Sequence, residues 1–356
     1  MSSARAPLAL ALQGGGAHGA FTWGVLDALL ARGAHPVRAV SGTSAGAINA
    51  VVLAHGWLDG GADGARAALA RFWTAVGTRL PFEWFTVGVG DGLGLTAPAR
   101  AMLHWTRYLS PYQLNPLDVN PLRDLLREQV DFERLRRSGD IRLFIAATHA
   151  NTGRLRVFRS REIDAERVLA SACLPSLHHA IEIDGQPYWD GGYSANPALF
   201  PLIVDGGAAD LLIVMLSPLS HAGAPRTARE IHDRTLEFAF NATFLREARL
   251  LGEAHAVARR SWLPLGALER RLRRTRFHLI DAHDQLGALP PETRLIAHLP
   301  FLQHLRERGR ERAQSWLDLH GAALGRRSSV DLARTFAPDA PRRRSAPGTP
   351  GPDPAE

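Results

Sequence analysis

The length and composition of the chain exclude several classes of protein. Its 356 residues, 46% of them hydrophobic, are enough for one large globular domain or two small ones. The single cysteine, Cys173, excludes an internal disulfide and fits a reducing compartment. The net charge of +7 comes entirely from arginine, because the sequence contains no lysine. Such an excess fits an anionic membrane, a nucleic acid or simply a basic surface.

The N-terminal stretch PLALAL, residues 7–12, follows Arg5 and loosely resembles a signal peptide. Its apolar run is short and leads directly into a glycine loop, so we interpret it as a buried first strand and expect no cleavage. No window of the sequence is long and apolar enough to span a bilayer. We therefore expect a cytoplasmic protein whose membrane contact, if any, is peripheral.

Short apolar strands alternate with helices along the chain. In chain order, the patterns predict a strand, a helix, a strand and a helix, then four strands, of which the third is short, and finally two long helices. These elements lie at 7–13, 17–31, 37–41, 45–55, 141–147, 154–158, 186–189, 211–216, 226–259 and 300–325. The alternation predicts an α/β fold of three layers with a mainly parallel central sheet.

Three regions depart from this alternation. Residues 71–121 are rich in aromatic residues, glycine and proline, and we interpret them as a cap inserted into a catalytic domain of residues 7–220. The cap aromatics either line an apolar groove or pack a small core of their own; they are Phe72, Trp73, Phe82, Trp84, Phe85, Trp105, Tyr108 and Tyr112. Residues 221–337 are expected to form a C-terminal helical region packed on that domain, and 338–356 a disordered tail.

The pentapeptide Gly42-Thr43-Ser44-Ala45-Gly46 has the pattern G-x-S-x-G between a predicted strand and a predicted helix. A serine at the tip of such a sharp turn needs small residues two positions before and after it. Its hydroxyl then lies at a helix N-terminus, where free N–H groups favour developing negative charge. Ser44 is therefore the candidate nucleophile, and a tight turn without chemistry is the alternative.

A second glycine motif, Gly14-Gly15-Gly16-Ala17-His18-Gly19, also joins a strand to a helix. It matches G-x-G-x-x-G, but a dinucleotide site needs an acidic residue at the end of the next strand. The next strand instead ends at Ser41 and Gly42. Unobstructed backbone N–H groups beside a helix start suit an oxyanion hole better, and nucleotide binding is kept as the weaker alternative.

A candidate base follows the strand QPYW. Asp190 ends that strand and precedes Gly191-Gly192, so its carboxylate can approach another loop closely. A partly desolvated aspartate can accept a serine proton directly. With 15 histidines in the chain, the presence of a histidine is uninformative, and D-G-G taken alone is a common turn.

Together, the three motifs resemble the patatin-like phospholipase family of serine acyl hydrolases, in its bacterial form. The resemblance covers residues 7–216 and rests on GGGAHG at 14–19, GTSAG at 42–46 and DGG at 190–192, in that order. It implies a Ser–Asp dyad, with Ser44 as nucleophile and Asp190 as base. It also implies an oxyanion hole of backbone N–H groups from Gly14, Gly15, Gly16 and Ala17. The motif positions that support these groups are His18, Gly19, Gly42, Gly46, Gly191 and Gly192.

The activity that the resemblance implies is hydrolysis of carboxylic esters in lipids through an acyl-enzyme, with no cofactor. No Cys/His cluster has metal-ligand spacing, so no metal is predicted either. The expected partner is a lipid or acyl-ester substrate, and nucleic acid is not expected because no recognised motif accompanies the charge. Esterase action on a storage polyester, nucleotide binding and an inactive membrane-interaction module are the alternatives.

One position departs from the family pattern. Family members usually carry arginine or lysine where this chain has His18, so a permanent cation is replaced by a group that titrates near neutrality. The resemblance predicts that arginine is tolerated there. A Ser–His–Asp triad through His18 is the alternative to the dyad, and a histidine that only caps or packs the helix is favoured over it.

The segment 259–279 carries seven arginines among Trp262, Leu263, Leu265 and Leu268. This mixture predicts reversible contact with an anionic membrane surface, and a solvated arginine face on an ordinary helix is the equal alternative. Near the motifs, Asn49 and Asn196 are expected to support loops.

Overall fold

The structure is a computed structural model. It describes residues 6–337 except 34, 80–85, 88–93, 99–100, 102–104, 106–107, 222, 263–265 and 288. The expected tail, 338–356, and the expected cap aromatics Phe82, Trp84 and Phe85 lie outside the described residues.

A central sheet organises the fold, in the order β10-β9-β1-β2-β5-β8-β7, with β6 also paired to β5. The first five strands in this order are parallel, whereas β6 and β8 run antiparallel to β5, and β7 antiparallel to β8. The strands are β1 (Leu8–Leu12), β2 (Val37–Gly42), β5 (Arg142–His149), β6 (Leu155–Arg159), β7 (Ile181–Ile183), β8 (Gln186–Asp190), β9 (Asp210–Met215) and β10 (Arg276–Asp281). A separate pair joins β3 (Thr86–Val87) to β4 (Gly94–Leu95).

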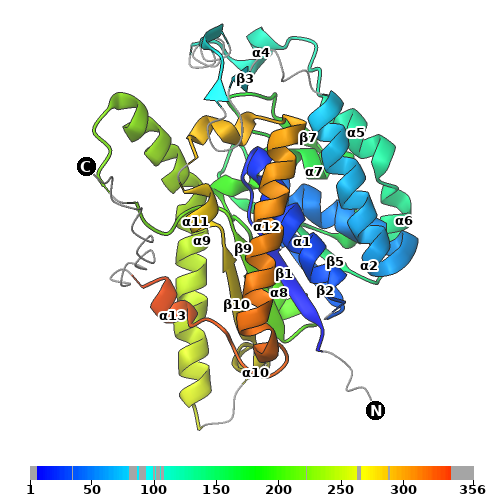
Figure 1. Ribbon diagram of the computed structural model, residues 1–356, viewed down its shortest axis with the longest axis vertical. Coiled ribbons are helices and arrows are strands. Elements are labelled where there is room, and N and C mark those ends of the chain that lie inside the picture. The colour runs from blue at the N-terminus through cyan, green and yellow to red at the C-terminus, as the bar shows by residue number, and fades with distance from the viewer. Residues whose placement is uncertain are drawn as a thin grey trace, which may run out of the picture.

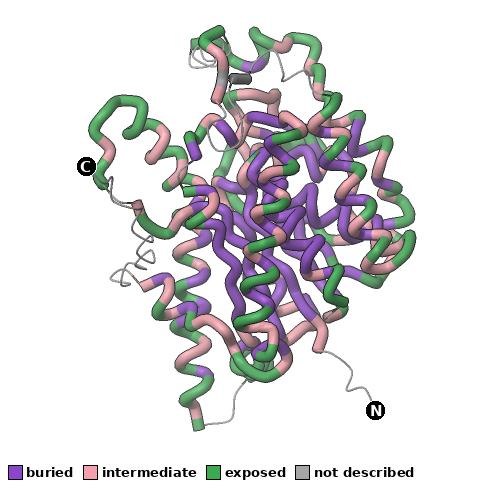
Figure 2. The backbone as a smooth tube through the Cα atoms, in the orientation of Figure 1, coloured by how far each residue is buried: buried purple, intermediate pink, exposed green. Residues whose placement is uncertain are grey.

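Side chains alternate across β1 and create the two cores of the molecule. Leu8, Leu10 and Leu12 point to one face, where they pack with residues of α1, α2 and α12. Ala9 and Ala11 point to the other face, where α8, α9 and α13 close a second cluster. Because both faces are covered, the strand is apolar at every position, as expected for a parallel sheet. The three layers and their buried centre are visible in Figures 1 and 2.

The helices cover the two faces of the sheet. In Figure 1, α1 and α12 lie side by side in front of the sheet, and α9 runs along one side. The α-helices are α1 (Gly19–Ala31), α2 (Ala45–Arg79), α4 (Pro111–Leu114), α5 (Pro121–Gln129), α6 (Phe132–Arg137), α7 (Ala165–Ser171), α8 (Phe200–Asp205), α9 (Ala228–Arg260), α10 (Ala267–Arg274), α11 (His283–Leu286), α12 (Leu299–His320) and α13 (Leu332–Thr335). Short 3-10 helices include η1 (Gly16–His18), η5 (Gly191–Tyr193) and η6 (Pro291–Leu295).

The predicted strands and helices are confirmed, with shifts of a few residues at their ends. The helix after Ser44 is longer than expected: it continues to Arg79 across a break at Gly60 and Gly61, whose backbone angles are not helical. Residues 71–79, placed in the cap by sequence, therefore belong to α2, and Phe72 and Trp73 are buried in the main core. The boundaries of the cap stay a prediction.

The region 221–337, expected to be helical, also contains one strand. Residues 276–281 form β10, which extends the sheet beyond β9. Its place is held by buried Asp210, which accepts hydrogen bonds from Arg276 and from the His278 ring. The sequence pattern does not reveal this strand, because its alternation of apolar and polar residues is short and an arginine-rich stretch precedes it. This region of the chain is therefore part of the same layered body.

Candidate active site

A strained turn carries Ser44 from β2 into α2. Its φ of 55° lies in the left-handed region, which a residue with a side chain adopts only when its surroundings enforce it. The two flanking glycines are those surroundings. A Cβ on Gly42 would collide with the backbone of Gly46, and one on Gly46 would collide with the carbonyl of Leu12. Ser44 itself is 9% exposed, so its side chain reaches a small opening.

Two hydrogen bonds from outside the pentapeptide hold this turn. The Ser44 N–H donates to Ser171 Oγ at 3.0 Å, and the Thr43 hydroxyl donates to the Ala195 carbonyl at 2.7 Å. Ser171 ends α7 and is fully buried. Its role could not be predicted, because a serine in a stretch of small residues has no distinguishing pattern. Only the packing of α7 against the sheet brings it to Ser44.

The glycine loop passes directly beside Ser44. A Cβ on Gly14 would lie 2.7 Å from the Cβ of Ser44, so only glycine fits there. The Gly14 N–H donates to Asn196 Oδ1 at 2.7 Å, which confirms the expected loop-supporting role of Asn196. Gly14 therefore has no free N–H, contrary to its expected place in an oxyanion hole.

The next residues of the loop do have free donors. Gly15 N–H has no acceptor among the described residues, and Gly16 and Ala17 open η1, whose first N–H groups have no acceptor within the helix. Gly16 has a φ of 59°, and a Cβ on it would collide with the Arg294 carbonyl of η6. Further along, a Cβ on Gly19 would collide with Ala45, so the two motif helices touch.

Asp190 is completely buried at the end of β8. Its Oδ1 accepts the Gly192 N–H at 2.8 Å, whereas Oδ2 has no hydrogen-bond partner among the described residues. Glycine is required at both following positions: a Cβ on Gly191 would strike the Ala146 carbonyl, and one on Gly192 would strike the ring of Phe240. Burial raises the pKa of the carboxyl to about 7, against the opposing effect of the Gly192 N–H and the nearby Ser44 hydroxyl.

His18 lies away from this pair. It is 3% exposed, its Nε2 contacts Thr293 Oγ1 at 2.8 Å, and its ring packs edge-on against Phe301. The Thr293 hydroxyl donates to the Pro290 carbonyl, so His18 Nε2 must be the donor in their contact. Burial, followed by the charge of Arg294, lowers the pKa of His18 to about 3. The ring is therefore neutral, and it fastens the glycine loop to η6.

Ser44 and Asp190 open into one large pocket of about 1400 Å³. The wall includes all four residues Gly14–Ala17, and on its other sides residues from α2, α5, α9 and η6. Most of the wall is apolar, with Ile48, Phe72, Trp73, Val76, Leu122, Leu125, Leu174, Leu177, Leu236, Phe240 and Leu295 among its residues. Such a wall suits an acyl chain.

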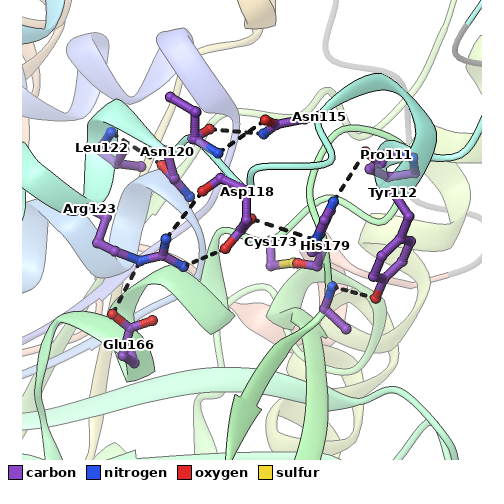
Figure 3. A network of polar contacts seen from close by, with 12 residues as sticks. Pro111, Tyr112, Asn115, Asp118, Asn120, Leu122, Arg123, Glu166, Cys173 and His179 are labelled. Carbon is purple, nitrogen blue, oxygen red and sulfur yellow. Dashed lines mark hydrogen bonds and ion pairs between the residues drawn. The ribbon is translucent and has the colours of Figure 1, made fainter.

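The described part of the expected cap is fastened beside this pocket (Figure 3). Tyr112 stacks on His179 with ring centroids 4.1 Å apart, and its hydroxyl accepts the Ala180 N–H. Arg123 pairs with both Asp118 and Glu166. Of the cap aromatics, Phe72 and Trp73 line the pocket, whereas Trp105, Tyr108 and Tyr112 are exposed by 57% or more.

Cys173 and Asn49 have structural contacts. Burial raises the pKa of the Cys173 thiol to about 12, and the thiol donates to the His179 carbonyl. Asn49 bridges the Gly19 carbonyl and the Trp73 indole. Among the described residues, no group of three or more His, Cys, Asp or Glu side chains could hold a metal ion.

The basic segment 259–279, of which Leu263 and Leu265 lie outside the described residues, leads into β10 from the other end of the sheet. Helix α10 precedes β10, whose first residue pairs with the first residue of β9, whereas Ser44 follows the last residue of β2. Because these strands are parallel, α10 lies at their N-terminal ends (Figure 1) and Ser44 at the opposite, C-terminal ends. Arg271 is bonded to the Val204 carbonyl and Arg276 to Asp210. Contact of this segment with an anionic membrane stays a prediction.

Comparison with protein-family sequence models gives a match to "Patatin-like phospholipase" over residues 10–203, more than half of the chain. The chain belongs to the patatin-like phospholipase family. Family membership supports a lipid hydrolase, and the mixed, mostly parallel sheet flanked by helices agrees with that family. Comparison with curated protein sequences gives no significant match. No helix in the described part of this patatin-like chain has the length and apolar character needed to cross a bilayer.

Several solved structures are similar to this patatin-like chain. VipD from Legionella pneumophila has 16% identity and a TM-score of 0.42, with 89% of this chain and 67% of VipD covered. The type III effector protein ExoU has 18% identity and a TM-score of 0.36, with 88% and 53% covered. ExoU in its complex with SpcU from Pseudomonas aeruginosa has 16% identity and a TM-score of 0.31, with 89% and 52% covered. The chain thus spans about half to two thirds of these proteins, and TM-scores below 0.5 support no argument about its site.

Proposed function

We propose that the protein is a serine lipid acyl hydrolase that cleaves carboxylic esters with Ser44 as nucleophile and Asp190 as the only general base. The main support for the proposal is the burial of Asp190 and its effect on the pKa of the carboxyl. The carboxyl is buried near the Ser44 hydroxyl, its Oδ2 has no hydrogen-bond partner among the described residues, and burial raises the pKa of the carboxyl to about 7. A base with a pKa near the working pH is the most effective in proton transfer.

The chemistry follows from these positions. Asp190 accepts the Ser44 proton as Oγ attacks the ester carbonyl, and the carbonyl oxygen becomes negatively charged. The N–H groups of Gly15, Gly16 and Ala17, beside the N-terminus of α2, donate to that oxygen. Collapse of the intermediate breaks the ester bond, and Asp190 returns the proton to the leaving alcohol. Water, deprotonated in turn by Asp190, then attacks the acyl-enzyme and releases the acid and free Ser44.

His18 has no part in this sequence of steps. A triad would need its ring within hydrogen-bond reach of Ser44 or Asp190, whereas its Nε2 bonds Thr293. Its pKa of about 3 also makes it too weak a base near neutral pH. The dyad is therefore preferred over the triad.

The apolar wall of the pocket favours a lipid acyl chain over a polar ester. No observation favours the alternatives: no acidic residue ends β2, where a nucleotide ribose would need one, and the open pocket at Ser44 does not suit an inactive module. Hydrolysis of a storage polyester involves the same chemistry, and profiling with phospholipids and polyester granules distinguishes the two substrates.

The test is labelling and hydrolysis by matched variants. The protein should react with a fluorophosphonate and hydrolyse a soluble ester, and Ser44→Ala should abolish both. Asp190→Asn should lower hydrolysis by about 10²–10⁴-fold while the protein stays folded, and the double variant should be no worse than Ser44→Ala because the two groups act as a unit. Ser176→Ala, which removes another serine of the pocket wall, should keep the label. Substantial hydrolysis by folded Ser44→Ala or Asp190→Asn would disprove the dyad.

A further inference from the structure

Three arginines line the pocket in the described part of the chain, and they differ in how fully they are paired: Arg79, Arg229 and Arg294. Arg79 is held by both carboxylate oxygens of Glu128. Arg229 bonds Glu292 at 2.5 Å and lies 3.8 Å from Asp233. Among the described residues, the guanidinium of Arg294 has one carboxylate within 4 Å, that of Glu237, at the long distance of 3.9 Å. Its charge is thus the least neutralised of the three.

Glu237 is itself engaged elsewhere. Its Oε1 is in contact with His221 Nε2 at 2.6 Å, while the other oxygen faces Arg294. If a ligand anion bound the guanidinium of Arg294, Glu237 would keep its contact with His221. A guanidinium has five N–H donors, and among the described residues Arg294 has no close hydrogen-bond acceptor for them. Arg294 therefore has unused donors inside the pocket.

The backbone fixes Arg294 beside the reacting groups. Its carbonyl lies against Gly16, so closely that a Cβ there would collide with it, and the preceding residue, Thr293, holds His18. The side chain is 31% exposed and lines the same pocket as Ser44 and Asp190. The charge of Arg294 also lowers the pKa of His18, which places the guanidinium near the glycine loop.

We infer that Arg294 binds the phosphate of a glycerophospholipid while its ester lies at Ser44, and so selects phosphate-bearing lipids over neutral ones. This inference rests on the proposed function. A planar guanidinium offers paired N–H donors that match two phosphate oxygens. The phosphate of such a lipid is joined to the scissile ester by a short stretch of glycerol, so both groups fit one pocket.

The experiment compares two soluble esters with the same acyl chains, dibutyrylphosphatidylcholine and glyceryl tributyrate, below their aggregation limits. For Arg294→Gln, the ratio of kcat/KM for the phospholipid to kcat/KM for the triester should fall about 10- to 100-fold, the effect of losing charge-assisted hydrogen bonds to phosphate. Arg294→Lys should lose less of the ratio, because it keeps the charge. Arg79→Gln is the matched control and should change the ratio by less than about fivefold, as expected for a pair at a partly exposed site.

The outcomes distinguish a failure of this inference from a failure of the proposed function. An unchanged ratio in Arg294→Gln, through equal loss on both esters or through no loss, would overturn the role of Arg294 and leave the dyad standing. A fall as large in Arg79→Gln would show a general effect of positive charge and overturn it as well. If the parent protein hydrolyses neither ester, the proposed function fails. Calorimetric binding of the phospholipid to Ser44→Ala then still tests Arg294: affinity that Arg294→Gln does not weaken refutes the inference.

Discussion

Replacement of Asp190 by asparagine should stabilise the protein at alkaline pH while it inactivates the enzyme. Asparagine has the shape of aspartate and keeps an oxygen that can accept the Gly192 N–H. It removes a buried negative charge whose Oδ2 has no hydrogen-bond partner among the described residues. The native state holds that charge without a neutralising partner, whereas the unfolded state exposes it to water.

The size of the effect follows from the pKa of the carboxyl, about 7 in the folded state against 3.8 for an exposed aspartate. The shift of about 3 units corresponds to about 4 kcal/mol, at 1.36 kcal/mol per unit. Between pH 3.8 and about 7 the folded state binds the proton and the unfolded state does not, so stability falls as pH rises through this window and then levels off. The gain from asparagine should therefore be up to about 4 kcal/mol at pH 8 and only about 1–2 kcal/mol at pH 5.

Urea unfolding of the parent and the Asp190→Asn variant at both pH values measures this difference. Asp63→Asn is the control, because that side chain is 91% exposed and its carboxylate is hydrated in both states. A variant that is no more stable than the parent at pH 8 would refute the argument. So would a gain of the same size at pH 5, since the reasoning requires titration of the native carboxyl.

Three further predictions follow from the same contacts. First, kcat/KM for a soluble ester should rise with pH and level off above about 7, because Asp190 must be ionised to act as base; a flat profile between pH 5 and 8 would contradict this. Second, His18→Gln should lower activity only modestly, since glutamine can still donate to Thr293, whereas His18→Arg should cost several kcal/mol in urea unfolding, because the site is buried and near Arg294. The family resemblance alone predicts that arginine is tolerated at position 18, and a stable, active His18→Arg would support that prediction. Third, Ser171→Ala should cost about 1–3 kcal/mol of stability and reduce activity, because the Ser44 N–H loses its acceptor; an active variant of unchanged stability would show that the turn holds itself.

The elements next to the site could be predicted from the local sequence. A continuous apolar run predicts a strand such as β1, which is buried on both faces, and small residues predict the sharp turn at Ser44 because any Cβ at 42 or 46 collides with backbone. The short strand β10 escaped prediction. Its stability comes from pairing with β9 and from the buried carboxylate of Asp210, partners that lie far away in sequence.

The candidate site divides in the same way. Three short motifs predict which residues have the right chemistry, Ser44 and Asp190, and which glycines surround them, because those requirements are local. Which N–H donors are free depends on tertiary contacts: the Gly14 N–H donates to Asn196, the His18 ring bonds Thr293 of η6, and Arg294 lines the pocket. Each of these contacts joins residues more than 180 positions apart or depends on what burial does to a charge, and neither can be deduced from the order of residues along the chain.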